Sequence, residues 1–317
     1  MRAGRIVIAG ASGFIGSALA RELALDGHEV VALTRNASAR RDRFPEGVRP
    51  VEWDGRTATA WKLSVDGALA VVNLAGDSLA RGLWSRAKKD RILESRILAG
   101  SALVAAVREA RTKPRVFVQA SAIGFYGDSG EAELDEDAPA GTGFLAGVVD
   151  KWEASTREVE DLGIRRVIIR SGLVLGRSGG VWPSLVRPFR FFAGGPLGSG
   201  RQWFSWIALE DEVRAVHFLI GNEELSGVFD LTAPQPLREK ELCRVLGKAL
   251  RRPCWVPVPA VLLELLFGEK ARETLLVSQR VLPRRLVAAG FEFRHPDAAA
   301  AVAAILRSEL RAGSPGD

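Results

Sequence analysis

Short apolar runs alternate with longer amphipathic stretches over the first two thirds of the chain. The apolar runs, rich in Val and Ile, lie at residues 5–10, 29–34, 68–76, 115–121 and 165–172, with a further one at 227–233. Such unbroken hydrophobicity is typical of parallel strands that are covered on both faces. The amphipathic stretches lie at residues 14–26, 84–110, 143–162 and 208–221. Strands that alternate with helices in this way predict an α/β fold with a doubly wound parallel sheet.

The character of the chain changes after residue 172. Residues 173–206 are rich in glycine, proline and aromatic side chains, and the pattern from residue 237 onward is mostly helical with proline breaks. We therefore predict a first α/β domain over residues 1–172, with residues 207–232 returning to it. Residues 173–206 and 233–317 are expected to form a smaller, mostly helical substrate region.

A glycine-rich loop joins the first strand to the first helix. It reads Gly10-x-x-Gly13-x-x-Gly16, with an apolar strand before it and a helical pattern after it. Gly10 allows a tight turn, Gly13 lets backbone N–H groups approach a pyrophosphate, and Gly16 lets the helix pack close to the strand. The helix N-terminus adds oriented donors for the phosphates. The loop in this context predicts a Rossmann domain that binds a dinucleotide.

The end of the second strand favours NADP (NADPH) over NAD. NAD sites usually place an acidic residue there to hold the ribose hydroxyl, whereas this strand ends in Thr34 and Arg35. Arg35 could hold a 2′-phosphate, with help from Arg40 and Arg41. The alternative is that these arginines are ordinary surface residues of a basic protein.

The expected cofactor contacts come from the carboxyl ends of several strands, where ligands of open parallel sheets gather. These residues are Gly10, Ser12, Gly13, Phe14, Ile15, Gly16, Thr34, Arg35, Asn73, Leu74, Ala75, Gly76, Ser121, Ser171 and Gly172.

The composition argues against several other classes of function. The net charge is +6, but the basic residues are not interleaved with aromatic ones, so no nucleic-acid partner is expected. The three histidines lie far apart, which argues against a metal site and a Ser-His-Asp site. Cys243 and Cys254 are interpreted as two small packing residues in a reducing compartment. No apolar run approaches the ~20 residues of a membrane helix and the N-terminus lacks a signal-peptide pattern, so we expect a cytoplasmic protein without a membrane partner.

Several motifs together resemble one enzyme superfamily. They include "GASGFIGSAL", "VVNLAGDSL", "SAIGFYG", "GSGRQWFSWIALEDEVRA" and "GVFDLTAPQPL", and the C-terminal third is similar as well. These segments resemble the extended short-chain dehydrogenase/reductases, the NAD(P)-dependent epimerase/dehydratase group. The match is closer to an atypical branch, the YfcH-like nucleoside-diphosphate-sugar epimerases, whose reaction is unassigned. The resemblance implies NADP in the cleft and a substrate region in the C-terminal third, but no known substrate.

The acid/base pair that this resemblance implies is missing. Ordinary members use Tyr-x-x-x-Lys, but Tyr126 is the only tyrosine and Gly130 stands four residues after it. Lys151 has Gly147, not a tyrosine, four residues before it. The catalytic candidates that remain are Ser121, Tyr126, Asp128, Lys151 and Glu153. Tyr126 is interpreted first as a wall of the substrate pocket and second as a proton donor, and Lys151 and Glu153 could equally belong to a solvated helix face.

The substrate pocket is expected to include Tyr126, Gln202, Ser205 and Trp206, while Asp211 is expected to cap or orient the helix that follows it. Two functions stay open. One is an NADP(H)-dependent oxidoreductase or epimerase-like enzyme for a small polar metabolite, with a nucleotide sugar as one candidate. The other is a non-catalytic NADP(H)-binding sensor or scaffold. A homodimer through the helices at 84–110 and 143–162 is expected by analogy alone.

Overall fold

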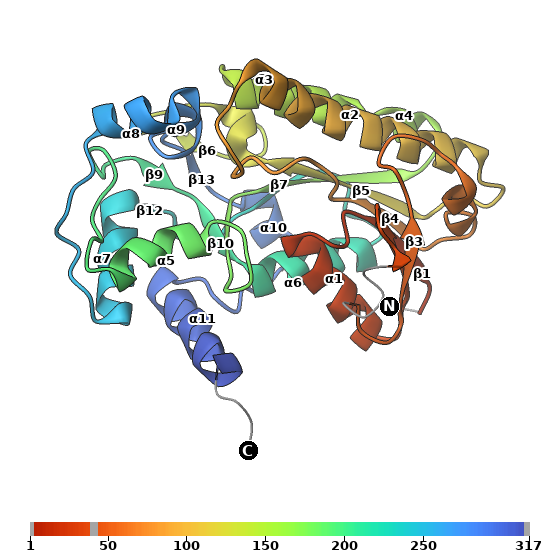
Figure 1. The fold of residues 1–317 in the computed structure, drawn as a ribbon. Helices are drawn as coiled ribbons and strands as arrows, with labels where there is room; N and C mark the ends of the chain where they lie inside the picture. The colour runs from red at the N-terminus through yellow and green to blue at the C-terminus, as the bar shows by residue number, and fades with distance from the viewer. Residues whose placement is uncertain (1–2, 39–43, 314–317) are drawn as a thin grey trace.

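A seven-stranded parallel sheet forms the centre of the molecule. The computed structural model describes residues 3–38 and 44–313. The strand order is β11-β7-β5-β4-β1-β2-β3, and every neighbouring pair is parallel. The strands are β1 (Arg5–Ala9), β2 (Glu29–Thr34), β3 (Val48–Glu52), β4 (Ala70–Asn73), β5 (Val116–Ala122), β7 (Arg165–Ser171) and β11 (Gly227–Leu231). The prediction of a doubly wound α/β fold is confirmed (Figure 1).

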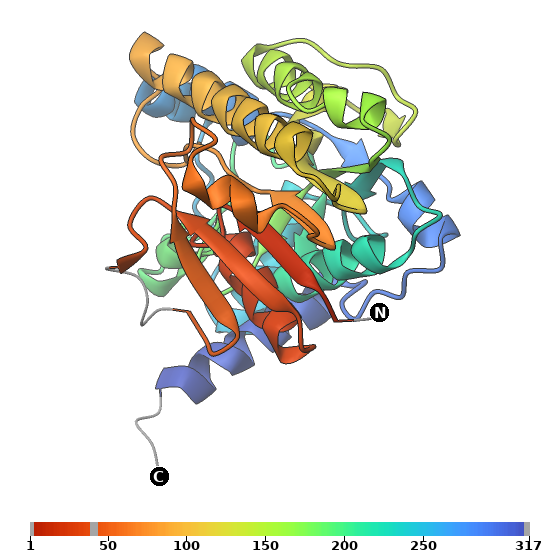
Figure 2. The same ribbon diagram turned by 90° about the vertical axis from the view of Figure 1, so that its right-hand side faces the viewer.

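Helices cover both faces of this sheet. On one face lie α2 (Arg86–Glu109), α3 (Phe144–Ala154) and α4 (Glu158–Asp161), and on the other lie α1 (Phe14–Leu25) and α6 (Leu209–Gly221). Figure 2 shows α2 and α3 side by side above the sheet. Successive side chains of β1 point to opposite faces of the sheet. Ile6 and Ile8 pack with α1 and α6, whereas Val7 packs with α2 on the other face.

Two elements depart from the sequence prediction. β3 was not predicted, because its sequence "VRPVE" contains only two strongly apolar residues, as suits the edge strand of a sheet. The helix expected over residues 143–162 is two helices, α3 and α4, separated by a turn. Ser155 Oγ donates to the carbonyl of Trp152 at 2.7 Å where α3 ends, and such a side-chain bond competes with continuation of a helix.

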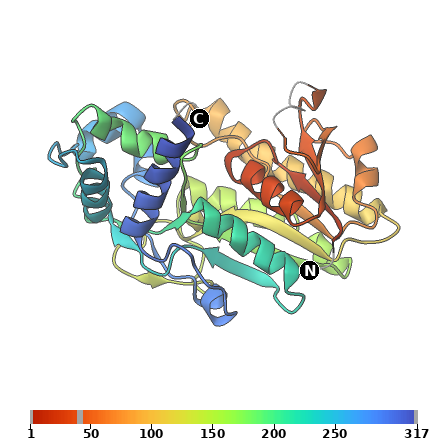
Figure 3. The same cartoon turned by 90° about the horizontal axis from the view of Figure 1, so that it is seen from below.

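The C-terminal part forms a second layered region beside the sheet. Its helices are α5 (Trp182–Arg190), α7 (Glu239–Leu250), α8 (Ala260–Phe267), α9 (Glu269–Thr274), α10 (Arg284–Ala288) and α11 (Ala298–Gly313). Short strand pairs join them to the rest: β8 (Leu173–Leu175) with β10 (Trp206–Ala208), β9 (Trp203–Phe204) with β12 (Leu237–Arg238), and β6 (Glu133–Leu134) with β13 (Arg280–Val281). Two 3-10 turns lie at Ala60–Ser64 and Ile123–Tyr126. Figure 3 shows α5, α7 and α11 grouped away from α1 and α6. Trp182, Trp206 and Leu246 lie in the core that these C-terminal helices share.

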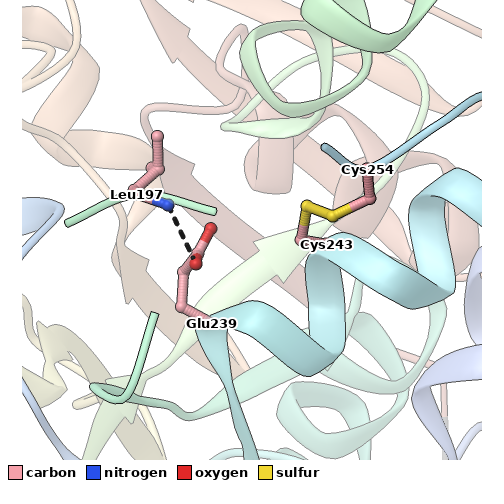
Figure 4. The surroundings of a disulfide bond; sticks show 4 residues. All are labelled: Leu197, Glu239, Cys243 and Cys254. Carbon is pink, nitrogen blue, oxygen red and sulfur yellow. Dashed lines mark hydrogen bonds between the residues drawn. A yellow bond between two sulfur atoms is a disulfide. The ribbon is translucent and has the colours of Figure 1, made fainter. Parts of the chain in front are cut away.

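The two cysteines are joined by a disulfide bond, so the interpretation of them as separate packing residues was wrong. Cys243 lies on α7 and Cys254 on the segment that follows it (Figure 4). The chain reverses at Arg251, which adopts a left-handed backbone conformation with φ 54°. This reversal brings the two Cα atoms to 6.2 Å, within the range that a disulfide can bridge.

A buried carboxyl lies at the start of the same helix. Glu239 Oε2 accepts the backbone N–H of Leu197 at 3.0 Å (Figure 4), and burial raises the pKa of Glu239 to about 7. The contact ties α7 to the loop before β9.

Within residues 3–38 and 44–313, every helix is too short or too polar to span a lipid bilayer.

Candidate functional site

The glycine loop after β1 has the geometry of a phosphate cradle. Gly10 has φ +83°, and a Cβ there would lie 2.6 Å from the carbonyl oxygen of Leu74. A Cβ on Gly16 would lie 2.3 Å from the carbonyl oxygen of Gly10. Both positions therefore require glycine. Helix α1 begins after Gly13 with no side-chain cap, which leaves the N–H groups of its first turn available to an anion.

The side chains around this loop hold it in place. The ring of Phe14 packs against the loop that contains Gly179 and Gly180, where an added Cβ would lie 2.9 Å and 2.7 Å from ring atoms. Phe14 is half-buried there, and its contact with the cofactor stays a prediction. Ser12 and Gly13 are exposed at the rim of the cradle.

Asn73 was predicted as a cofactor contact, but its side chain is fully buried and occupied by protein partners. Its Nδ2 donates to Gln119 Oε1 at 2.9 Å, and its Oδ1 accepts the N–H of Ala75 at 3.2 Å. Asn73 thus shapes the loop after β4, in which Gly76 is exposed.

Thr34 and Arg35 end β2 as predicted from the strand pattern. Thr34 is buried and Arg35 is exposed. The turn after them is held by Glu52, whose Oε2 accepts the N–H of Ala37 at 2.8 Å. Arg40 and Arg41 lie outside the described residues.

Tyr126 belongs to a buried polar chain, so the prediction that it walls the substrate pocket was wrong. Its hydroxyl oxygen lies 2.9 Å from both carboxylate oxygens of Asp230 and accepts from Arg170 Nη1 at 3.0 Å. Arg170 in turn donates from Nε and Nη2 to Glu153 at 2.9 Å and 3.0 Å. Ser121 Oγ donates to Glu153 Oε1 at 2.5 Å. The ring of Tyr126 is only 3% exposed.

The environment of Tyr126 keeps its hydroxyl protonated. Burial, followed by the charge of Asp230, raises the pKa of Tyr126 far above its usual value of 10.0. Burial and the charge of Glu136 raise the pKa of Asp230 as well. Tyr126 therefore cannot act as a base, and its proton is committed to Asp230.

The other catalytic candidates differ in exposure and in their hydrogen-bond partners. Lys151 is exposed on α3, as expected for a solvated helix face. Glu153, two residues later, has a side chain that is 12% exposed and points inward to Arg170 and Ser121. Asp128 Oδ1 accepts the N–H of Ser278 at 3.1 Å, which fastens the C-terminal region to the loop after Tyr126. Only Ser121 and Glu153 are brought together by the fold.

A largely apolar pocket of about 200 Å³ lies at the carboxyl edge of the sheet. It is lined by residues of α2, α3 and the C-terminal region. They are Leu79, Arg96, Ala122, Ile123, Gly124, Leu145, Val148, Val149, Trp152, Ser171, Gly172, Leu173, Trp203, Phe204, Ser205, Glu273, Thr274, Val277 and Gln279. The cavity therefore borders two of the predicted cofactor residues, Ser171 and Gly172.

The predicted substrate residues of the 202–206 segment are mostly structural. Gln202 Nε2 donates to the carbonyls of Leu197 and Leu275, both at 3.0 Å, and Trp206 is fully buried with its Nε1 bonded to the Gln235 carbonyl. Neither residue lines the pocket.

Ser205 does line the pocket, but its hydroxyl is occupied. It accepts the N–H of Val281 at 2.8 Å and donates to the Gln279 carbonyl at 2.9 Å. Trp203, which the sequence left open between packing and a substrate wall, lines the pocket beside it, as does Gln279, which was not predicted as a site residue. The indole of Trp203 lies against the guanidinium groups of Arg238 and Arg280.

Two acidic residues at the start of α6 have different roles. Asp211 does not cap its helix: its carboxylate accepts the N–H groups of Arg294 and His295 at 2.8 Å each, which anchors the segment before α11. Glu212 is fully buried and its Oε1 lies 2.5 Å from Ser171 Oγ, while its Oε2 has no partner within the described part of the chain. Burial raises the pKa of Glu212 to about 8. The sequence analysis missed this contact, because it joins the end of β7 to α6, 41 residues later in the chain.

Comparison with known proteins identifies the family. Residues 6–230 match the NAD dependent epimerase/dehydratase family. The chain belongs to this family. Residues 258–305 also match a domain of unknown function, DUF1731. The superfamily predicted from the motifs is thus confirmed, and the assignment to the YfcH-like branch stays a prediction.

Relatives align over nearly the full chain. Epimerase family protein Mb2239 of Mycobacterium bovis is 41% identical over 92% of this chain and 93% of its own length. The chloroplastic SDR39U1 homologue of Arabidopsis thaliana is 39% identical over 95% of this chain and 86% of its own length. The crystal structure of human epimerase family protein SDR39U1 with NADPH superposes with a TM-score of 0.86 at 32% identity, covering 96% of this chain and 99% of the human chain.

Proposed function

We propose that this protein is an NADP(H)-dependent oxidoreductase for a small carbonyl compound or the corresponding alcohol. One observation carries the proposal: the apolar pocket shares Ser171 and Gly172 with the expected cofactor edge, at the same end of the sheet as the glycine cradle. A parallel sheet gathers its ligands at that end. NADPH in the structure of the human relative supports the choice of cofactor.

The residues of the cradle fit a dinucleotide. Gly10 and Gly16 leave no room for a side chain, and the uncapped first turn of α1 offers donors to a pyrophosphate. Arg35, exposed at the end of β2, would bind a 2′-phosphate. When bound, the nicotinamide supplies hydride transfer to or from a substrate carbon.

Ser121 is the residue best placed to handle the substrate proton. Ser121 is itself buried beneath the pocket wall: it precedes Ala122, which lines the pocket, and its Oγ donates to Glu153. Arg170 holds the Glu153 carboxylate through two hydrogen bonds. During reduction, Glu153 would take up a proton from solvent and donate it to Ser121 Oγ, which frees the Ser121 hydroxyl proton for the substrate oxygen. Oxidation would run the same path in reverse.

The pocket favours a small substrate over a nucleotide sugar. Its volume of about 200 Å³ lies below the roughly 300–1,000 Å³ of clefts that hold drug-sized ligands. Its walls are also mostly aliphatic and aromatic, including Leu145, Val149, Leu173 and Phe204. A nucleotide sugar would need more volume and more polar partners than these residues offer.

Cofactor binding and turnover test the proposal in two steps. Purified protein is first titrated with NADPH, and oxidation of NADPH is then followed by absorbance across a panel of small aldehydes, ketones and oxoacids. Removing a proton-transfer group typically costs about 10²–10⁴-fold in rate, so Ser121→Ala should lose about that much of its turnover at saturating NADPH. Ser101→Ala, a serine exposed on α2, is the matched control and should keep full activity. Equal rates for Ser121→Ala and wild type would contradict the assigned role of Ser121.

A non-catalytic sensor is the second candidate function. It is favoured by the burial of the only tyrosine hydroxyl against Asp230 and by Gly130 at the place of the dyad lysine. Tight NADPH binding without oxidation by any compound of the panel would support the sensor and refute the enzyme.

A further inference from the structure

Arg96 brings a buried positive charge to the wall of the apolar pocket. It lies on α2 and is 8% exposed. Its guanidinium carbon lies 4.8 Å from the centre of the Trp152 ring. A Cβ placed on Gly76 would lie 3.0 Å from the same guanidinium carbon. The side chain thus lies between the exposed loop after β4 and the pocket.

Arg96 has no acidic partner within the described part of the chain. The charge of Asp77 stabilises the Arg96 guanidinium only from a distance, because the Asp77 carboxylate pairs with Lys88 at 2.7 Å. Arg96 makes no ion pair within 4.0 Å among residues 3–38 and 44–313. Burying a guanidinium without a close counter-charge is unfavourable. Burial lowers the pKa of Arg96 to about 10, so the side chain is still charged at neutral pH.

Part of the hydrogen-bonding capacity of Arg96 is unused. Its Nη1 donates to the carbonyls of Ile92 at 2.9 Å and Asp77 at 3.2 Å. Neither Nε nor Nη2 donates to a described residue, although a guanidinium has five N–H donors. Nearby, Trp152 Nε1 is buried and also lacks an acceptor among the described residues. The wall of the pocket therefore offers more donors than the protein satisfies.

Glu273 is the one carboxylate among the described residues that line the pocket, and it does not pair with these unused donors. Glu273 accepts the N–H groups of Phe144 and Leu145 with its two oxygens, each at 3.0 Å. Its charge is thereby used at the N-terminus of α3, where a carboxylate is stabilised. The remaining walls are mainly apolar.

We propose that Arg96 binds an anionic group of the substrate, so that the pocket selects a small, mainly apolar carbonyl compound bearing one carboxylate. This inference rests on the function proposed above. A planar guanidinium matches a carboxylate through two parallel hydrogen bonds. Arg96 is the one cation among the described residues that line the pocket, which suits a monoanion and not a nucleoside diphosphate. The apolar walls would hold the hydrocarbon part.

Equilibrium binding tests this inference separately from turnover. The NADPH-saturated protein is titrated with phenylglyoxylate, 4-methyl-2-oxopentanoate and the methyl ester of each, with tryptophan fluorescence as the signal. The acids should bind more tightly than their esters by about 10- to 100-fold, the range of a charge-assisted hydrogen bond. Arg96→Gln should remove this preference, and Arg96→Lys should restore part of it. Arg86→Gln, at the exposed first position of the same helix, should retain it.

Several results would overturn the inference. Equal binding of acids and esters by the wild type, or no binding of any of these compounds, would refute the anion site without use of a variant. If Arg96→Gln weakened NADPH binding as much as acid binding, Arg96 would instead serve a cofactor phosphate. Acid-selective binding without NADPH oxidation would leave the anion site standing and refute the proposed oxidoreductase activity, so the two failures are distinguishable.

Discussion

Replacing Tyr126 with phenylalanine should destabilise the protein while leaving the cofactor cradle intact. The substitution removes only the hydroxyl, which is the sole side-chain donor to Asp230 among the described residues and also accepts from Arg170. Asp230 is fully buried, so no water replaces the lost donor. Hydrogen bonds to charged groups contribute roughly 1.5–3 kcal/mol each. A loss of about 2–4 kcal/mol of unfolding free energy is therefore expected.

This loss corresponds to a measurable change in melting temperature. An unfolding entropy of about 2.1 cal/mol/K per residue gives roughly 0.7 kcal/mol/K for a chain of this length, so the midpoint should fall by roughly 3–6 °C. Denaturant unfolding followed by tryptophan fluorescence measures the free energy directly, since the chain has eight tryptophans. NADPH affinity, measured in parallel, should be unchanged.

A double-mutant cycle with Asp230→Asn isolates the hydroxyl–carboxylate contact. With a neutral amide at position 230, removal of the Tyr126 hydroxyl should cost less than in the wild type by the energy of the hydroxyl–carboxylate contact, while the hydrogen bond from Arg170 is lost in both backgrounds. The reasoning is refuted if Tyr126→Phe costs less than about 0.5 kcal/mol, or if it costs the same in both backgrounds.

Three further outcomes are expected elsewhere in the molecule. The unfolded chain releases the Glu212 proton near pH 4.5 and the folded protein holds it to about pH 8, so Glu212 alone should lower stability by about 1.4 kcal/mol per pH unit between these values. Glu212→Gln should reduce the slope in urea melts by that amount, while the raised pKa values of Glu239 and Asp230 leave a remaining slope; identical slopes would contradict the assignment. Arg35→Asp should weaken NADPH binding far more than NADH binding in parallel titrations, and equal losses would exclude a 2′-phosphate contact. Reduction of the bond between Cys243 and Cys254 should expose two thiols to a labelling reagent and lower stability by about 3 kcal/mol; two reactive thiols before reduction would disprove the bond.

Local pattern was sufficient to predict most of the central sheet. β1, β2, β4, β5 and β7 were recognisable because strands buried on both faces must be apolar at nearly every position. The edge strand β3 was missed because it lacks that requirement. The glycine loop was predictable for a similar reason. Backbone carbonyl oxygens lie so close to Gly10 and Gly16 that a Cβ at either position would clash with them.

The candidate site was less predictable, since its contacts join residues far apart in the chain. Sequence analysis could exclude the Tyr-x-x-x-Lys pair by counting, and it included Ser121 and Glu153 among several candidates. It could not foresee that Tyr126 turns toward Asp230, which follows it by 104 residues. Nor could it distinguish Arg96 from the many exposed arginines of a basic chain, because its burial depends on the packing of α2 against α3.

The sequence by itself determined the fold class, the dinucleotide loop and the loss of the usual acid/base pair. These features are local: periodic hydrophobicity and glycine at sterically closed positions are written within a few neighbouring residues. Only the tertiary structure decided which polar side chains face the pocket and which serve the interior. Burial decides this, because a charged or hydroxyl group that is removed from water needs a hydrogen-bond partner, and that partner can lie far away in the sequence. The Tyr126 hydroxyl is hydrogen-bonded to Asp230 in the interior. Arg96 instead has N–H groups without an acceptor among the described residues, on the side of the fold that faces the pocket.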